Sequence, residues 1–307
     1  MQPGIGILLK LGAVTAFVLM QVLIKSTAGS VPAGEVVFFR SFFAFPVILA
    51  WLAWRRELRV GLTTRNPMSH VWRGVIGTSA MGLGFAALQL LPLPEVTALG
   101  YAAPILTVVF AAMFLGEQVH AFRITAVALG MAGVMIVLAP RLTAVSAGAP
   151  GAAQALGAVL ALMSATFAAL AQIFLRKMAA TERAATVVFW FTVTSTVFSL
   201  FTIPFGWVLP DGRAAALLIG AGLMGGIGQG LLTSAYRFAP ASVVAPFDYV
   251  SMLLAVGLGY ALFSEVPTAQ TLAGAGLVVL AGVLIVWRER QLGIERAKAR
   301  RMSAPQA

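Results

Sequence analysis

Long apolar stretches recur along the chain and are separated by short polar connections. A helix needs roughly 20 predominantly apolar residues to cross the hydrocarbon core of a bilayer. Ten stretches approach or reach this length, although the fifth is short, and no connection between them is long enough to form a soluble domain. They cover Ile5–Ile24, Glu35–Trp54, Val71–Leu91, Val96–Leu115, Ile124–Ala139, Leu156–Leu175, Ala184–Pro204, Ala214–Tyr236, Ser242–Phe263 and Ala269–Trp287. The pattern predicts an all-α integral membrane protein with ten transmembrane helices.

The second half of the chain repeats the first. EVVF at residues 35–38 returns as TVVF at 186–189, and GVMIV at 133–137 returns as GVLIV at 282–286. Five spans in each half would insert the second copy upside down, giving an inverted 5+5 repeat like those that frame the central site of secondary transporters. The expected domains are a first five-helix repeat at 1–140, a linker at 141–153, a second repeat at 154–288 and a basic cytoplasmic tail at 289–307.

Composition and charge support this interpretation. Hydrophobic residues make up 60% of the chain and charged residues 10%, outside the usual range of soluble proteins. With the amino terminus in the cytoplasm, sixteen Lys and Arg residues fall on the cytoplasmic side and three fall outside, which are Lys25, Arg141 and Arg213. Loops rich in Lys and Arg usually lie on the cytoplasmic side of the membrane. We therefore expect a multi-pass protein of the cytoplasmic (inner) membrane with both termini in the cytoplasm.

The net charge, the residue content and the motifs of the chain also narrow the range of expected partners. The net charge of +11 favours anionic lipid headgroups at the basic loops and tail over nucleic acid. With no cysteine and only two histidines, neither a metal site nor a cofactor is expected. No GxxxxGK[ST] loop, GxSxG or HExxH is present, which argues against ATP-driven transport and against an enzyme. A small-molecule substrate is the expected partner, and a homodimer is left open.

Charged side chains within spans are the first candidates for a substrate site, because burying them in lipid is costly. Asp248 is the only acid well inside a span, and we predict that it binds a substrate cation or a coupled proton; a helix-locking hydrogen bond is the alternative. Arg40 and Lys25 are the predicted anion contacts, although Arg40 could also be structural. The depths of Arg40 and Asp248 differ by roughly 13 Å at 1.5 Å per residue, so a direct pair between them is not expected.

Polar and aromatic residues also follow the repeat. Gln21 and Gln172 are counterparts, as are Tyr101 and Tyr249, and the two tyrosines should bracket the midplane from opposite sides. A tyrosine offers a flat apolar face and a hydroxyl, although helix packing is an equal alternative. The full predicted substrate site is Gln21, Arg40, Tyr101, Gln172, Asp248 and Tyr249.

Other residues predict how the helices pack. Gly222, Gly226 and Gly230 recur every four residues in the eighth span, a spacing that lets helix backbones approach closely. Three prolines lie inside spans, where they tend to bend helices, namely Pro46, Pro104 and Pro246. Glu117 and Glu265 end the fourth and ninth spans and are expected at the membrane interface.

Three segments resemble the EamA-type proteins of the drug/metabolite transporter superfamily: EVVFFRSFFAFP, PLPEVTALGYAAPILTVVFAAMFLGEQV and AGAGLVVLAGVLIVWRER. The resemblance covers residues from about 5 to 290 and implies ten helices around a central cavity. PFDYVSMLLAVGLGYALFSEVP is similar to members that handle S-adenosylmethionine or riboflavin, while other relatives export amino acids. Phe17 and Met20 stand where much of the family has a first-span tryptophan.

These observations together predict a secondary transporter that moves a small polar or amphipathic metabolite by alternating access. A lipid or lipid-precursor flippase is the first alternative, because a groove open to the bilayer leaves no clear mark in a sequence. A non-transporting membrane scaffold is the second. A channel is disfavoured, because the buried charges are scattered and form no ring of like charge.

Overall fold

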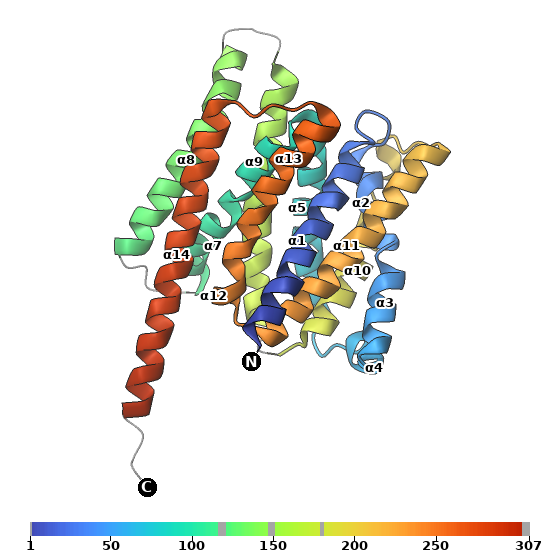
Figure 1. The fold of residues 1–307 in the computed structure, drawn as a ribbon. Coiled ribbons are helices and arrows are strands. Elements are labelled where there is room, and N and C mark those ends of the chain that lie inside the picture. The colour runs from blue at the N-terminus through green and yellow to red at the C-terminus, as the bar shows by residue number, and fades with distance from the viewer. Residues whose placement is uncertain (1, 116–120, 147–150, 179–180, 303–307) are drawn as a thin grey trace.

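A computed structural model describes residues 2–115, 121–146, 151–178 and 181–302, and all regular structure in these ranges is helical (Figure 1). Glu117, residues 147–150 of the expected linker and residues 303–307 of the expected tail lie outside the described residues. In the first half the helices are α1 (Pro3–Lys25), α2 (Ala33–Phe42), α3 (Phe45–Trp54), α4 (Leu58–Leu62), α5 (Pro67–Leu90), α6 (Leu93–Gly100), α7 (Ala102–Leu115) and α8 (Ala121–Ser146). In the second half they are α9 (Ala152–Met178), α10 (Ala184–Leu200), η1 (Ile203–Phe205), α11 (Gly212–Phe238), α12 (Ala241–Val244), η2 (Ala245–Tyr249), α13 (Val250–Phe263) and α14 (Ala269–Met302).

These helices form ten membrane-crossing segments, five in each half. Within the described residues, eight segments are long and apolar enough to span a bilayer, and Ile124–Pro140 and Ala184–Leu200 are shorter apolar helices. Large apolar side chains face outward, among them Leu253 and Tyr260, which are 73% and 65% exposed. An apolar exterior of this kind suits lipid rather than water. The chain is therefore a multi-pass membrane protein, as the apolar pattern predicted.

Three of the predicted spans are broken helices. The second divides between Phe42 and Phe45, next to Pro46. Proline has no backbone N–H to donate to the preceding turn of a helix. The fourth divides at Tyr101, and the ninth begins as a 3₁₀ helix that ends at Tyr249. Tyr101 and Tyr249 are counterparts in the repeat, so the fourth segment of each half is interrupted at the same place.

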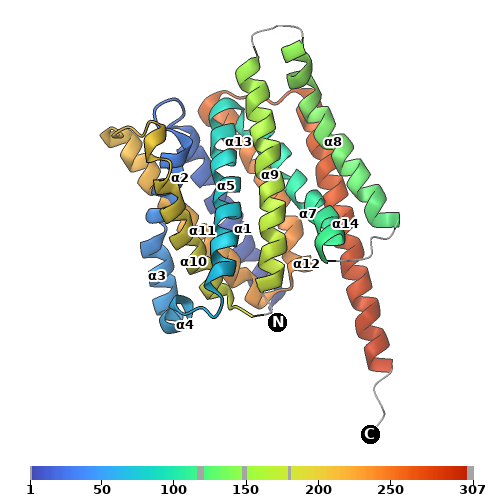
Figure 2. The same ribbon diagram turned by 180° about the vertical axis from the view of Figure 1, so that it is seen from behind.

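The helices pair across the two halves in a reciprocal pattern. The first segment of one half packs on the third of the other, so that α1 lies along α11 and α5 lies along α9. The second segments, α2–α3 and α10, contact each other, and the fifth segments, α8 and α14, form a pair. Figures 1 and 2 show that α1 and α9 begin at opposite ends of the bundle. This arrangement is an inverted repeat. We call the end where α1 begins and α14 ends the base, and the opposite end the top.

Small residues allow the close approach of α11 to its neighbours. A Cβ atom added at Gly222 would lie 2.5 Å from Cβ of Phe43, and one added at Gly226 would lie 2.9 Å from Cβ of Val47. On another face of the same helix, Gly228 lies against the ring of Phe17 in α1. The close packing predicted from the glycine spacing is confirmed.

Candidate functional site

Two cavities meet where the fourth segments of the two halves are broken. The larger, of about 450 Å³, lies among α1, α5, α6 and α9. The smaller, of about 280 Å³, lies among α6, α7, η2 and α14. Gly100, Tyr101 and Ser251 line both cavities and form the wall between them. In membrane transporters, irregular backbone at depth is tolerated where it lines a cavity of this kind.

The two tyrosines of the helix breaks form the centre of this wall. The rings of Tyr101 and Tyr249 pack edge to face, with centroids 5.1 Å apart. The hydroxyls of Tyr101 and Ser251 lie 2.6 Å apart, and Ser251 donates to the carbonyl of Asp248 at 2.6 Å. No side chain could be added at Gly282, because the Tyr249 hydroxyl occupies that space. The two residues expected on opposite sides of the midplane therefore touch each other.

An ion pair between Lys10 and Asp248 lies on the base side of the tyrosines. Nζ of Lys10 lies 2.7 Å from Oδ1 of Asp248; the lysine side chain is 3% exposed and the aspartate side chain 49% exposed. A buried ammonium needs a counter-charge. Asp248 is therefore held by α1 while one side remains open to the smaller cavity. Lys10 had no predicted role, although it enters the first span to nearly the depth that Asp248 has in the ninth.

A second ion pair closes the top of the same helices. Nζ of Lys25 lies 2.8 Å from Oε1 of Glu265 and also donates to the carbonyls of Leu88 at 3.3 Å and Leu91 at 2.5 Å. The Glu265 carboxylate accepts from the backbone N–H of Leu93 at 2.8 Å. All three ammonium protons of Lys25 are thereby used by groups of the protein, and its contact with a substrate anion stays a prediction. Glu265 lies near the top, and its carboxylate links the second half of the chain to Lys25 and Leu93 of the first half.

Arg40 is buried in α2, with 6% of its surface exposed. A Cβ added at Gly225 of α11 would lie 3.0 Å from its Nε. Within the described residues no acid pairs with Arg40, and its Nε has no hydrogen-bond partner. Arg73 of α5 lies close enough for the two like charges to repel, and it stacks on Phe191 at 4.0 Å. A buried and a half-buried cation without a nearby counter-charge together create a local preference for an anion.

Arg73 also links this cationic region to the larger cavity. Its Nη1 lies so close to Gly77 that a Cβ there would be 2.6 Å away, and Gly77 lines the cavity. Sequence reasoning assigned Arg73 to the cytoplasmic end of a span and gave it no role. The signal that could have identified Arg73 is its place on the helix. It lies one turn before Gly77, on the same face of the predicted third span.

The predicted site residues are only partly brought together. Gln21 lines the larger cavity, Asp248 and Tyr249 line the smaller one, and Tyr101 lines both. Arg40 lines neither cavity, and Gln172 is exposed on α9. Their assignment to a substrate site stays a prediction. The residues that the sequence did not identify are Lys10, Arg73 and Ser251.

An inverted ten-helix bundle with broken helices around central cavities is the architecture of secondary transporters. The particular family follows from the sequence. The EamA-like transporter family matches residues 4–139 and 155–287, one match in each half. The chain belongs to this family. The family predicted from sequence segments is confirmed, and the protein is a secondary transporter rather than an enzyme.

Relatives with assigned cargo are similar over nearly the whole chain. The pseudopaline exporter CntI of Pseudomonas aeruginosa (strain UCBPP-PA14) is 31% identical, covering 91% of this chain and 95% of its own. The riboflavin transporter of Rhizobium johnstonii is 29% identical, covering 84% of this chain and 82% of its own. The S-adenosylmethionine uptake transporter of Rickettsia felis is 28% identical, covering 84% of each chain. Three different cargoes occur at similar identity.

A solved crystal structure supports the fold. It covers 95% of this chain and 99% of its own, with a TM-score of 0.64 and 20% sequence identity. At this identity the likeness shows the fold alone.

Proposed function

We propose that this transporter moves a small polar or amphipathic metabolite that carries both a cationic and an anionic group. The observation that carries the proposal is the pair of cavities joined at Tyr101, with a half-exposed carboxylate on one side and unpaired guanidinium groups near the other. Asp248 is positioned to exchange Lys10 for a cationic group of the substrate or for a proton. Arg40 and Arg73 attract a carboxylate or phosphate.

The tyrosine pair and Gln21 complete the proposed site. The two rings present apolar faces to a planar or aliphatic part of the substrate, and Gln21 offers both a donor and an acceptor to the larger cavity. Gln172 stays a predicted contact. The named cargoes of the relatives support metabolites such as pseudopaline, riboflavin and S-adenosylmethionine, with amino acids as a further class.

We infer that the base faces the cytoplasm and that the protein lies in the cytoplasmic (inner) membrane. Sixteen Lys and Arg residues fall on that side of the predicted topology against three on the other. Transport then proceeds by alternating opening of the top and the base around the tyrosine pair. The proposed repeats are 1–140 and 154–288, anionic lipids are proposed at the basic loops, and a homodimer stays a prediction.

A thermal-shift screen of the purified protein tests this function. The panel contains S-adenosylmethionine, riboflavin, nucleosides and amino acids, and a ligand at 100 times its dissociation constant is expected to add about 2.7 kcal/mol of stability. Asp248→Asn, Arg40→Gln or Tyr249→Phe should reduce the ligand-induced shift. Arg213→Gln and Tyr260→Phe, which change exposed side chains of the same types, should leave it intact.

Two outcomes would replace the proposal. If no metabolite stabilises a well-folded sample while the reconstituted protein moves phospholipid between leaflets, the cargo is lipid. If the site variants impair only assembly and never ligand binding or uptake into vesicles, the protein is a scaffold.

A further inference from the structure

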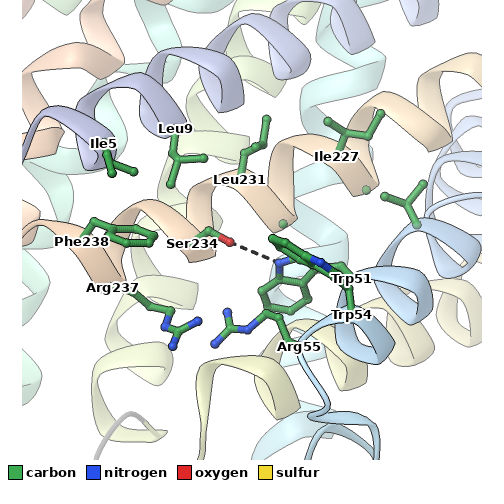
Figure 3. Close-up of a pocket in the computed structure, with 13 residues that line it drawn as sticks. Ile5, Leu9, Trp51, Trp54, Arg55, Ile227, Leu231, Ser234, Arg237 and Phe238 are labelled. Carbon is green, nitrogen blue, oxygen red and sulfur yellow. Dashed lines mark hydrogen bonds between the residues drawn. The ribbon is translucent and has the colours of Figure 1, made fainter. Parts of the chain in front are cut away.

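A third cavity lies apart from the transport site, on the outer side of α1, α3 and α11. Its volume is about 570 Å³, and nearly all of its wall is apolar. Ile5 and Leu9 form one side, and the α11 surface from Gly226 to Phe238 forms the floor (Figure 3). Gly226 and Gly230 bring this floor into close contact with α3, which forms the opposite side of the groove.

The groove has the length of one membrane leaflet. The twelve steps from Gly226 to Phe238 span about 18 Å at a rise of 1.5 Å per residue, a little more than half of the roughly 30 Å hydrocarbon core. The groove runs from the middle of α11 to its base end. Trp54, which is 83% exposed, stands at that end, at the level where tryptophan prefers the membrane interface.

Two arginines mark the base end of the groove. Figure 3 shows the guanidinium groups of Arg55 and Arg237 pointing toward each other, while the apolar side chains lie farther along the groove. Nη2 of Arg55 donates to Oε1 of Glu57 at 2.8 Å, but Nε of Arg55 has no hydrogen-bond partner in the described part of the chain. No acid in the described ranges forms an ion pair with Arg237. The two facing cations therefore have one neighbouring carboxylate, that of Glu57, and their mutual repulsion favours a further anion between them.

Two contacts hold the wall of the groove together at the same level. The indole N–H of Trp51 donates to Oγ of Ser234 at 3.2 Å, joining α3 to α11. The guanidinium of Arg55 lies over the Trp51 ring, 4.8 Å from its centroid. Both the cation and the apolar wall are therefore held in place before a ligand arrives.

We propose that this groove binds an anionic phospholipid of the leaflet at the base. One acyl chain lies along Leu9, Ile227 and Leu231, and the phosphate of the headgroup lies between Arg55 and Arg237. The length of the apolar wall suits an acyl chain, and the two facing arginines suit a negatively charged headgroup. This site is separate from the tyrosine cavities, so it would bind lipid whether or not the proposed substrate is correct.

Native mass spectrometry of the full chain in detergent tests the site. After delipidation, the protein is titrated with dioleoylphosphatidylglycerol and, separately, with dioleoylphosphatidylcholine. Arg237→Gln and Arg55→Gln should each weaken phosphatidylglycerol binding about fivefold and affect phosphatidylcholine much less. Ile227→Trp fills the groove and should reduce binding of both lipids.

Matched controls separate the groove from general effects. Arg59→Gln removes an exposed cation near the same end, and Leu253→Trp adds bulk on another lipid-facing surface; neither should change lipid binding. Glycerol 1-phosphate, which lacks acyl chains, should not displace the lipid. The proposal is overturned if Arg237→Gln has no larger effect than Arg59→Gln, or if glycerol 1-phosphate competes as well as intact lipid. It is also overturned if the groove variants block substrate uptake while lipid binding is unchanged.

Discussion

At the scale of single residues, the cationic side chains within the helix bundle fall into two groups, those that contact a carboxylate and those that do not. Lys10 and Lys25 each contact a carboxylate from the second half of the chain, at 2.7 and 2.8 Å. Arg40 and Arg73 have no such counter-charge in the described residues. The paired charges hold helices together, whereas the unpaired ones favour an anion.

The Lys10–Asp248 pair gives a prediction for stability. Asp248→Asn leaves a buried ammonium without its counter-charge and should destabilise the protein by about 1–3 kcal/mol, less than a fully buried pair because Asp248 is half exposed. Lys10→Met removes the buried charge and leaves an aspartate that water can reach, so its cost should be small. Unfolding midpoints in detergent measure both.

The double variant Lys10→Met/Asp248→Asn is the decisive control for this pair. It should recover most of the stability that Asp248→Asn loses, because no buried ammonium remains. A double variant as unstable as Asp248→Asn alone would show that the aspartate stabilises the fold through other contacts.

At the scale of helices, function depends on where they break and how closely they pack. The fourth segments of both halves are interrupted at Tyr101 and Tyr249, and the cavities lie at these interruptions. Glycines bring α11 against α2–α3 on one side and α1 on the other. The apolar pattern predicted the helices and their glycine contacts. The meeting of the two breaks depends on packing between segments about 150 residues apart, and local pattern carries no signal for it.

Two glycine substitutions test the packing of α11. Gly222→Ala places a Cβ 2.5 Å from Cβ of Phe43 and should cost about 1–3 kcal/mol through overpacking. Gly257→Ala in α13 meets no heavy atom within 4 Å and should be neutral or stabilising by up to about 1 kcal/mol, because alanine favours a helix. Thermal unfolding in detergent compares them. Equal effects at the two sites would refute the close α11 contact as a stabilising feature.

The tie at the top of α1 predicts a change in access to the larger cavity. The chain has no cysteine, so Gln21→Cys introduces a single reactive thiol into the cavity wall. Glu265→Gln weakens the tie to Lys25 and should raise labelling of that thiol by an externally added, membrane-impermeant maleimide about tenfold, as expected for a loss of about 1.4 kcal/mol.

The matched control for this gate is Glu57→Gln. It weakens an ion pair of similar length, with Arg55, at the base. It should leave labelling from outside unchanged. If both variants raise labelling equally, the effect reflects general loosening of the bundle and not a gate at the top.

At the scale of the whole molecule, polar contacts join the two halves at both ends. At the base, Glu182 in the connection before α10 accepts from Oγ1 of Thr64 at 2.7 Å and from the backbone N–H groups of Arg65 and Asn66 at 3.1 and 3.2 Å. His70 lies 3.8 Å away. Burial tends to raise the pKa of Glu182, but these hydrogen bonds and His70 outweigh it and hold the pKa below its ordinary value of 4.5.

The lowered pKa of Glu182 gives a pH-dependent contribution to stability. Because the folded state favours the charged carboxylate, the contribution is present above the ordinary value of 4.5 and is lost as the pH falls through the folded pKa. The unfolding midpoint should therefore fall more steeply below pH 4.5 in the native protein than in Glu182→Gln. Thr64→Val, which removes one donor, should give an intermediate slope. Identical slopes in all three proteins would rule out Glu182 as the titrating contact.

The sequence alone determined the ten spans, the family and the transporter class, because hydrophobic length and repeated motifs are local properties of the chain. It also identified Asp248 and the two tyrosines as candidates, because polar groups in apolar spans stand out. Only the tertiary structure decided their partners. Lys10 binds Asp248, Lys25 binds Glu265 and Tyr101 touches Tyr249 because the inverted packing of the two halves brings these residues together. The repeat relates the two tyrosines along the chain, but it gives no sign that they touch.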